Sequence, residues 1–145
     1  MKRYYDYLQA QIQTDSVPFA IDLLDQSTPE EEKHNVIHRA NMSGKVTLIH
    51  KEFGRGTNFR CDNKTINDLG GPVVILSRFP ATVSEEMQEF GRTARQGDNG
   101  SVVMVLSAED VHKEYGIVLD EAQQQSGSDI YKALCRLRAE KIYKE

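Results

Sequence analysis

The sequence predicts an α/β fold built on a parallel sheet of about four strands. Short apolar runs bounded by Gly or Ser alternate with segments of helical periodicity, which is typical of strand–helix–strand units. The apolar runs are nearly continuous, and this favours strands that are covered on both faces. The 145 residues have the size of one domain. A function that needs two lobes closing on a substrate must therefore borrow the second lobe.

The first third of the chain predicts helix, strand, helix. An amphipathic helix opens the chain, because its apolar residues share one side of a 3.6-residue period: Tyr4, Tyr5, Leu8 and Ile12. Residues 17–24 then predict a short strand. Thr28 indicates a helix start, with Pro29 at the first helical position and Glu31 completing a capping box. We expect that helix to end at about Asn41.

Three further strands are predicted from short apolar runs, at residues 46–49, 72–76 and 102–106. A helix is expected over residues 82–94, with Val83, Met87, Phe90 and Ala94 toward the core. After a break at residues 126–128, a helical stripe predicts a C-terminal helix: Ile130, Leu134 and Leu137.

Composition excludes several classes of protein. With 18 basic and 22 acidic side chains, the net charge of −4 argues against general binding to nucleic acid. The two cysteines, Cys61 and Cys135, form no CxxC motif, so neither a disulfide framework nor a zinc site is indicated. No run approaches the about 20 apolar residues of a membrane span, and no signal peptide opens the chain. We expect a cytoplasmic protein.

Two clusters of residues suit phosphate chemistry. Gln88, Arg92 and Arg95 share the polar side of the predicted helix, which leads into a turn at residues 96–100. Guanidinium groups at such an edge suit a polyphosphate. The second cluster, residues 54–58 (Gly-Arg-Gly-Thr-Asn), follows the strand that ends near Ile49, and its glycines let the backbone pass close to a ligand. Each cluster taken alone is more often an ordinary surface helix or turn.

In order and spacing, these clusters resemble motifs V and VI of superfamily 2 helicase-type ATPases, and specifically those of the SecA family. Residues 54–58 match that family's GRGTD element. The family's QxxGRxxRQGDxGS element is matched at nine positions: Gln88, Gly91, Arg92, Arg95, Gln96, Gly97, Asp98, Gly100 and Ser101. The Gly-Gly pair before the 72–76 strand and residues 106–110 also resemble the family.

The resemblance implies the second RecA-like domain of a two-lobed, ATP-driven motor. It implies that Arg92 and Arg95 act catalytically as arginine fingers toward an ATP held, with Mg²⁺, on a separate Walker-bearing lobe. The same resemblance implies that other motif residues bind or sense the nucleotide: Gln88, Gly54, Arg55, Gly56, Thr57, Asn58 and Asp98. The sequence has no GxxxxGK[ST] motif, so we expect no ATPase activity and no bound cofactor in this chain alone. A polypeptide is the substrate that the resemblance implies.

The chain also departs from the family. Asn58 stands where aspartate is usual, Phe90 replaces a basic residue, and Asn99 replaces a proline. We expect a RecA-like domain over residues 1–115 that lacks its first strand, because the chain opens on a helix, and a helical extension over 116–145. The missing strand indicates a truncated, fragmentary or diverged chain.

Two other functions stay open. The fold could serve as a catalytically silent interaction module, or it could be half of a nucleic-acid helicase, which the net charge disfavours. Two further patterns are more simply structural. Asp120 and Glu121 resemble a Walker B ending but lie after motif VI, and His34 and His38 lack a third metal ligand.

Overall fold

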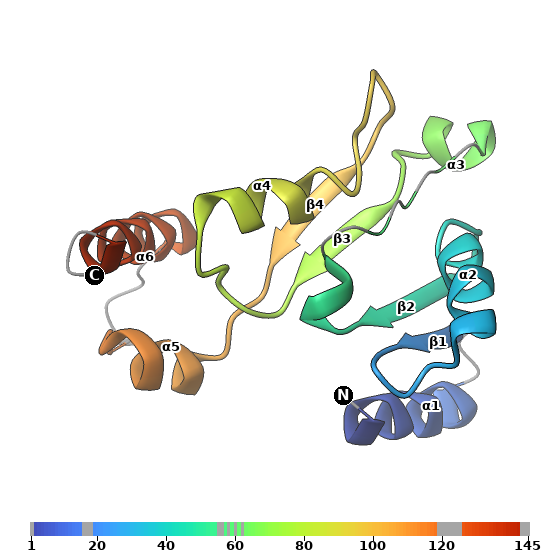
Figure 1. Cartoon of the computed structure of the whole chain (residues 1–145), viewed down its shortest axis with the longest axis horizontal. Coiled ribbons are helices and arrows are strands. Elements are labelled where there is room, and N and C mark those ends of the chain that lie inside the picture. The colour runs from blue at the N-terminus through green and yellow to red at the C-terminus, as the bar shows by residue number, and fades with distance from the viewer. Residues whose placement is uncertain are drawn as a thin grey trace. The chain divides into compact units, whose positions relative to one another are not determined.

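The structure is a computed structural model, and it describes residues 2–15, 19–54, 57, 59, 61, 63–118 and 126–142. Helices and strands alternate along the chain, as expected for an α/β fold (Figure 1). The elements are α1 (Lys2–Asp15), β1 (Ala20–Leu24), α2 (Glu30–Arg39), β2 (Lys45–Ile49), the 3₁₀ turn η1 (Lys51–Gly54), α3 (Lys64–Asp68), β3 (Val73–Leu76), α4 (Val83–Phe90), β4 (Ser101–Met104), α5 (Ala108–Tyr115) and α6 (Gly127–Ile142). All four predicted strands and the C-terminal helix are thereby confirmed.

The chain forms two compact units. The first contains residues 1–74 and 87–101, and the second contains residues 75–86 and 102–145. The predicted division into a domain over residues 1–115 and an extension over 116–145 does not coincide with these two units, and it stays a prediction. No helix in the described ranges is both long and apolar enough to cross a membrane.

The first unit is built around a parallel strand pair. Strand β1 runs beside β2, with Ala20 opposite Lys45 and Leu24 opposite Ile49. Helices α1 and α2 pack against β1 (Figure 1). A small core lies at this junction, formed by the buried side chains Leu24, Val36 and Phe59 together with Ile37, Ala40, Ile49 and Phe53.

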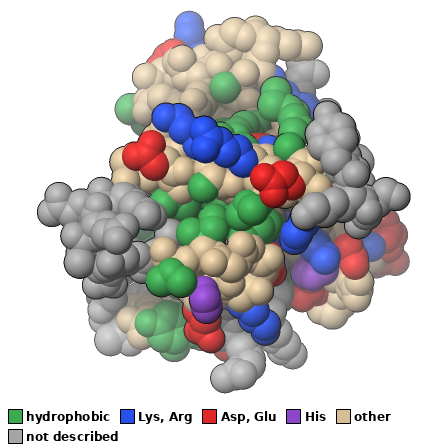
Figure 2. Space-filling model, turned by 90° about the vertical axis from the view of Figure 1, so that its left-hand side faces the viewer, with side chains coloured by type: hydrophobic (Ala, Val, Ile, Leu, Met, Phe, Trp, Pro, Cys, Tyr) green, Lys and Arg blue, Asp and Glu red, His purple; other side chains and the backbone are tan. Residues whose placement is uncertain are grey.

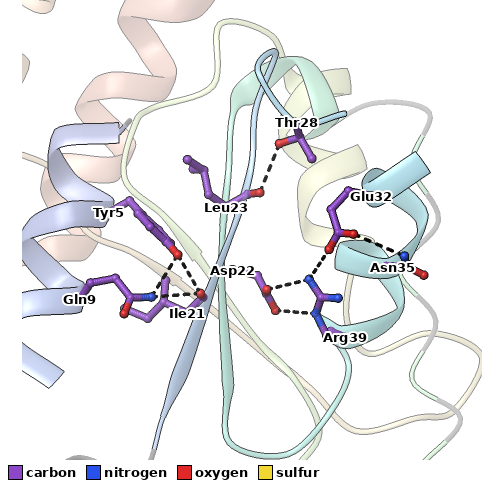
Figure 3. A network of polar contacts seen from close by, with 9 residues as sticks. All are labelled: Tyr5, Gln9, Ile21, Asp22, Leu23, Thr28, Glu32, Asn35 and Arg39. Atoms are coloured by element: carbon purple, nitrogen blue, oxygen red, sulfur yellow. Dashed lines mark hydrogen bonds and ion pairs between the residues drawn. The ribbon is translucent and has the colours of Figure 1, made fainter. Parts of the chain in front are cut away.

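Polar contacts fix the two helices to β1 (Figure 3). The side chains of Tyr5 and Gln9 on α1 both donate to the Ile21 carbonyl oxygen, at 3.4 and 3.3 Å. On the other helix, Arg39 binds Asp22 of β1 at 2.9 Å and Glu32 at 2.8 Å. Because Glu32 lies in the first turn of α2, one guanidinium joins both ends of the helix to the strand.

Thr28 does not cap α2, so this expectation was wrong. Its hydroxyl donates to the Leu23 carbonyl oxygen at 3.3 Å (Figure 3). The same hydroxyl accepts the Asp25 N–H at 3.0 Å. The hydroxyl is thus engaged by the end of β1. Pro29 occupies the N-cap position, so no side-chain hydrogen bond caps the start of α2.

Strands β3 and β4 form a second two-stranded sheet, whereas one continuous sheet was expected. Backbone N–H groups of Ser101 and Val105 donate to the carbonyl oxygens of Pro72 and Leu76, an offset that stays constant as in parallel pairs. Burial on both faces was a wrong expectation. Leu76 is buried, but Ile75 on the next pleat is 64% exposed.

The second unit has its own core, centred on the buried side chains Phe79, Val111 and Leu134. Met104, the last residue of β4, and Leu106 beyond it pack against this cluster, while Val102 and Val103 within β4 are exposed. Other hydrophobic side chains are also exposed, and Figure 2 shows some among acidic and basic groups on one face. Short apolar runs therefore do not by themselves distinguish a strand covered once from one covered twice.

Candidate functional site

The helix predicted to carry the motif arginines is shorter than expected, because α4 ends at Phe90. After it, the N–H groups of Arg92 and Thr93 bond three residues back, and Ala94 has a positive φ of 53°. These bonds tighten the chain into a turn. Arg92 and Arg95 therefore project from a loop, and the prediction of a polar helix face that carries them was wrong.

The predicted core face of α4 was also wrong. Val83 and Met87 are exposed, whereas Glu86 and Glu89 are buried. Glu86 tolerates burial because Arg138 pairs with it at 2.7 Å and the Tyr131 hydroxyl donates to it at 2.6 Å.

The loop after α4 folds back onto the start of β3. Buried Thr93 donates from its hydroxyl to the Pro72 carbonyl oxygen at 2.7 Å. A Cβ atom on Gly100 would lie 1.8 Å from the Thr93 hydroxyl oxygen, and one on Gly71 would lie 1.8 Å from the Asn99 carbonyl oxygen. The absence of side chains at both glycines is what permits this close approach.

A cavity of about 520 Å³ opens in the first unit, beside this loop. Its lining includes three of the predicted site residues, Arg92, Arg95 and Asp98. The rest of the lining comes largely from the segment before β3 and from the loop itself: Phe59, Cys61, Asn63, Lys64, Asn67, Pro72, Thr93, Ala94, Gln96 and Asn99. The structure thus brings the motif arginines together with a lysine and an aromatic ring.

Arg92 is the half-buried cation of this cavity. Its guanidinium carbon lies 5.7 Å from the centroid of the Phe59 ring. Burial and the nearby charge of Arg95 lower the pKa of Arg92, and Glu89 partly opposes that shift. Arg95 itself is exposed, and its Nε donates to the Gly91 carbonyl oxygen.

The other predicted site residues are not gathered at the cavity. Gln88 is exposed on α4 and is not part of the cavity lining. Gly54 ends η1, and Thr57 is half-buried. Three members of the same cluster lie outside the described residues: Arg55, Gly56 and Asn58.

The two patterns interpreted as structural give no site in the described parts of the chain. His34 and His38 are both exposed on α2, and no group of three or more potential metal ligands occurs among the described residues. Asp120 and Glu121 lie outside those residues.

Sequence reasoning missed Phe59 and Lys64. Phe59 directly follows the 54–58 cluster, and Lys64 opens α3 behind the helix-capping Asn63, whose side chain accepts the Thr65 and Ile66 N–H groups. The sequence does show the glycine-rich cluster before Phe59 and the helix-capping residue before Lys64. Only the fold shows that Phe59 and Lys64 line the same cavity as Arg92.

No family model matches the chain. It is similar to several SecA proteins. It is 31% identical over 105 residues to Protein translocase subunit SecA 2 of Nitrosospira multiformis, an alignment that covers 72% of this chain and 15% of the relative. It is 38% identical over 79 residues to SecA 2 of Magnetococcus marinus, covering 54% of this chain and 12% of the relative. The chain thus spans a small part of these relatives.

Among solved structures, the chain is similar to the C-terminal part of the Fun30 ATPase domain, with a TM-score of 0.51 and 16% identity. The match covers 99% of this chain and 46% of that one, and at this identity it speaks for the fold. The chain therefore shares the α/β fold of that ATPase part. In sequence it is SecA-like, and this confirms the resemblance drawn from the motifs.

Proposed function

We propose that this chain is the second nucleotide-site lobe of a SecA-like, ATP-driven motor. In this proposal Arg92 and Arg95 act as arginine fingers on an ATP held by a separate Walker-bearing lobe, while Gln88 and Arg55 relay nucleotide state. The observation that carries the proposal is the placement of both arginines along one cavity of about 520 Å³.

The charges of the cavity suit a polyanion. The described lining residues include three cationic side chains, Lys64, Arg92 and Arg95, and a single carboxylate, that of Asp98. The pKa of Arg92 is lowered because its charged form is disfavoured by partial burial and by the nearby charge of Arg95. A phosphate group between the two guanidinium groups would offset this effect, and the planar fork of arginine can share charge with phosphate oxygens.

ATP would supply the phosphoryl group that is transferred. Among the described residues, Lys64, Arg92 and Arg95 line the cavity and could face its phosphates. The described lining offers only one carboxylate, so in this proposal the Mg²⁺ ligands belong to the Walker-bearing lobe. The names of the relatives, protein translocase subunits, support a polypeptide as the substrate that the motor moves.

The test is ATP turnover by the cognate Walker-bearing lobe with and without this chain. Arg92→Lys keeps the charge and loses the planar fork, and Arg95→Ala removes the side chain beyond Cβ. We expect kcat to fall by about 10³-fold or more for each, with a smaller change in nucleotide affinity, because the fingers act mainly on transition-state charge. Arg136→Ala is the matched control, since Arg136 is exposed on α6 and lies outside the cavity lining.

Equal stimulation by the wild type and both finger variants would contradict the proposal. The same holds if the wild type fails to stimulate a folded partner lobe. Either result would favour the silent interaction module. Asn58→Asp is an informative companion variant, because a gain in turnover would show that the carboxylate missing from the 54–58 cluster limits coupling.

A further inference from the structure

The ring of Phe59 lies beside the guanidinium group of Arg92. The distance from Arg92 Cζ to the ring centroid is 5.7 Å, which is within the range of a cation–π contact. Both residues line the same cavity. The contact joins residues that are more than thirty positions apart, one after the 54–58 cluster and one in the loop that follows α4.

The Phe59 ring is part of the hydrophobic core of the first unit. Phe59 is 6% exposed and packs in one cluster with Leu24 of β1 and Val36 of α2. Those two side chains are themselves buried within a strand and a helix. Phe59 is therefore a fixed surface, even though it lies outside any helix or strand.

Arg92, in contrast, projects from a turn. It lies two residues beyond the end of α4, so no helix backbone fixes the direction of its side chain. A long arginine side chain loses about 1.5 to 2 kcal/mol of rotamer entropy when it is ordered. A rigid aromatic face beside the guanidinium restricts that freedom before any ligand arrives.

We infer that Phe59 is a positioning residue for Arg92, with its ring holding the guanidinium at the wall of the cavity. The consequence for turnover rests on the proposed function, in which Arg92 is an arginine finger. A group that is ordered in advance loses less freedom when it meets the transition state, so positioning should appear in kcat more than in KM. The contact itself can be tested without any nucleotide.

The direct test measures the order of the Arg92 Nε–H group in the 145-residue chain by ¹⁵N relaxation, with the signal assigned by its loss in Arg92→Lys. Phe59→Leu removes the ring and keeps a large apolar side chain, and Phe59→Tyr keeps the ring. We expect Arg92 to stay ordered in wild type and Phe59→Tyr. In Phe59→Leu its order parameter should fall toward the flexible range, below about 0.6.

Unfolding is measured on all variants, and Phe59→Met replaces Phe59→Leu if the latter does not fold. In the joined motor, Phe59→Leu should lower kcat by about 5- to 30-fold, the fold-change that corresponds to a cation–π contact, while KM changes little. Phe59→Tyr should keep turnover near that of the wild type. A merely structural role would instead lower the stability of both variants without separating their kcat values.

Unchanged Arg92 order in folded Phe59→Leu overturns the inference, whatever the turnover. If Arg92 order falls in Phe59→Leu but Arg92→Lys leaves turnover intact, the positioning contact stands and the proposed function fails. The two failures are therefore distinguishable.

Discussion

Asn67 and Asn99 face each other through two hydrogen bonds. The backbone N–H of Asn99 donates to Asn67 Oδ1 at 2.5 Å, and the Asn99 side-chain amide donates to the Asn67 carbonyl oxygen at 2.9 Å. Position 99 is one at which the chain departs from the SecA-like motif, where proline is usual. Proline has no N–H to donate. The departure therefore comes with a matching partner on α3.

We expect Asn99→Pro to lower the free energy of unfolding by about 1 to 2 kcal/mol, because both hydrogen bonds are lost. Asn67→Ala removes only the side-chain acceptor, so its cost should be smaller. Urea denaturation of both single variants and the double variant measures the coupling. If the two costs simply add, the residues are not partners in solution.

Gly100 is required by a close approach within the loop after α4, because Thr93 and Ala94 lie against it. Gly100→Ala would place a methyl group 1.8 Å from the Thr93 hydroxyl oxygen and 2.6 Å from the Ala94 nitrogen. We expect a loss of about 1 to 3 kcal/mol of stability, because the backbone must move. Gly127→Ala is the control, since that position has open space at the start of α6, and it should be neutral or stabilising by up to about 1 kcal/mol. Equal melting temperatures for the two variants would contradict this account.

The ion pair between Glu86 and Arg138 is a buried polar contact of the second unit. Its side chains are 3% and 7% exposed, and the Arg138 guanidinium also lies 4.7 Å from the Phe79 ring centroid. Glu86→Ala should destabilise by about 3 to 5 kcal/mol, because it leaves a buried charge without its carboxylate partner. Lys132→Ala is the control, because its pair with Asp129 is largely exposed and should contribute less than about 1 kcal/mol. Denaturant unfolding curves give both values.

Tyr131 gives this contact a pH dependence. Its hydroxyl donates to Glu86 at 2.6 Å, and this hydrogen bond raises the pKa of Tyr131. The bond needs the protonated phenol, so its stabilising contribution is complete below the ordinary tyrosine pKa of about 10 and is lost as the pH rises above it. Tyr131→Phe should therefore flatten the alkaline fall in unfolding free energy. Tyr7→Phe, at an exposed position on α1, should leave that fall unchanged.

The fold was predictable because its elements leave local signals. The structure places each of the four strands within a few residues of an apolar run, and the helical stripe at the carboxyl end predicted α6. The face of α4 was not predictable in the same way. Val83 and Met87 have the spacing of a core stripe, but Arg138 and Tyr131, from α6, provide the partners that allow Glu86 to be buried instead.

The site was predictable only as far as its motifs extend. Arg92, Arg95 and Asp98 stand in a motif of fixed spacing, and they do line one cavity. Phe59 and Lys64 carry no such signal. Phe59 packs with Leu24 of β1 and Val36 of α2, and both Phe59 and Lys64 line the cavity. Contacts between distant segments arise from the fold, and a single sequence does not display them.

Without a partner lobe, this chain should bind nucleotide only weakly. The cavity offers cations, but the sequence contains no phosphate-binding loop to add successive backbone amides. We therefore expect Mg-ATP to bind more weakly than micromolar. The affinity should fall steeply between ionic strengths of about 0.01 M and 0.15 M, where the screening length shortens from about 30 to 8 Å. Titration calorimetry at both salt concentrations measures this dependence.

Two arginine variants separate the cavity from general surface charge. Arg92→Gln should remove most of the low-salt binding, because Arg92 is the half-buried cation in the cavity. Arg136→Gln changes the net charge by the same amount at an exposed site on α6. Any loss of ATP affinity in this variant therefore measures the effect of overall protein charge alone. Equal losses in the two variants would show that ATP does not use the cavity in this chain. Micromolar affinity that persists at 0.15 M salt would show instead that the chain holds nucleotide without a second lobe, which the arginine-finger proposal does not allow.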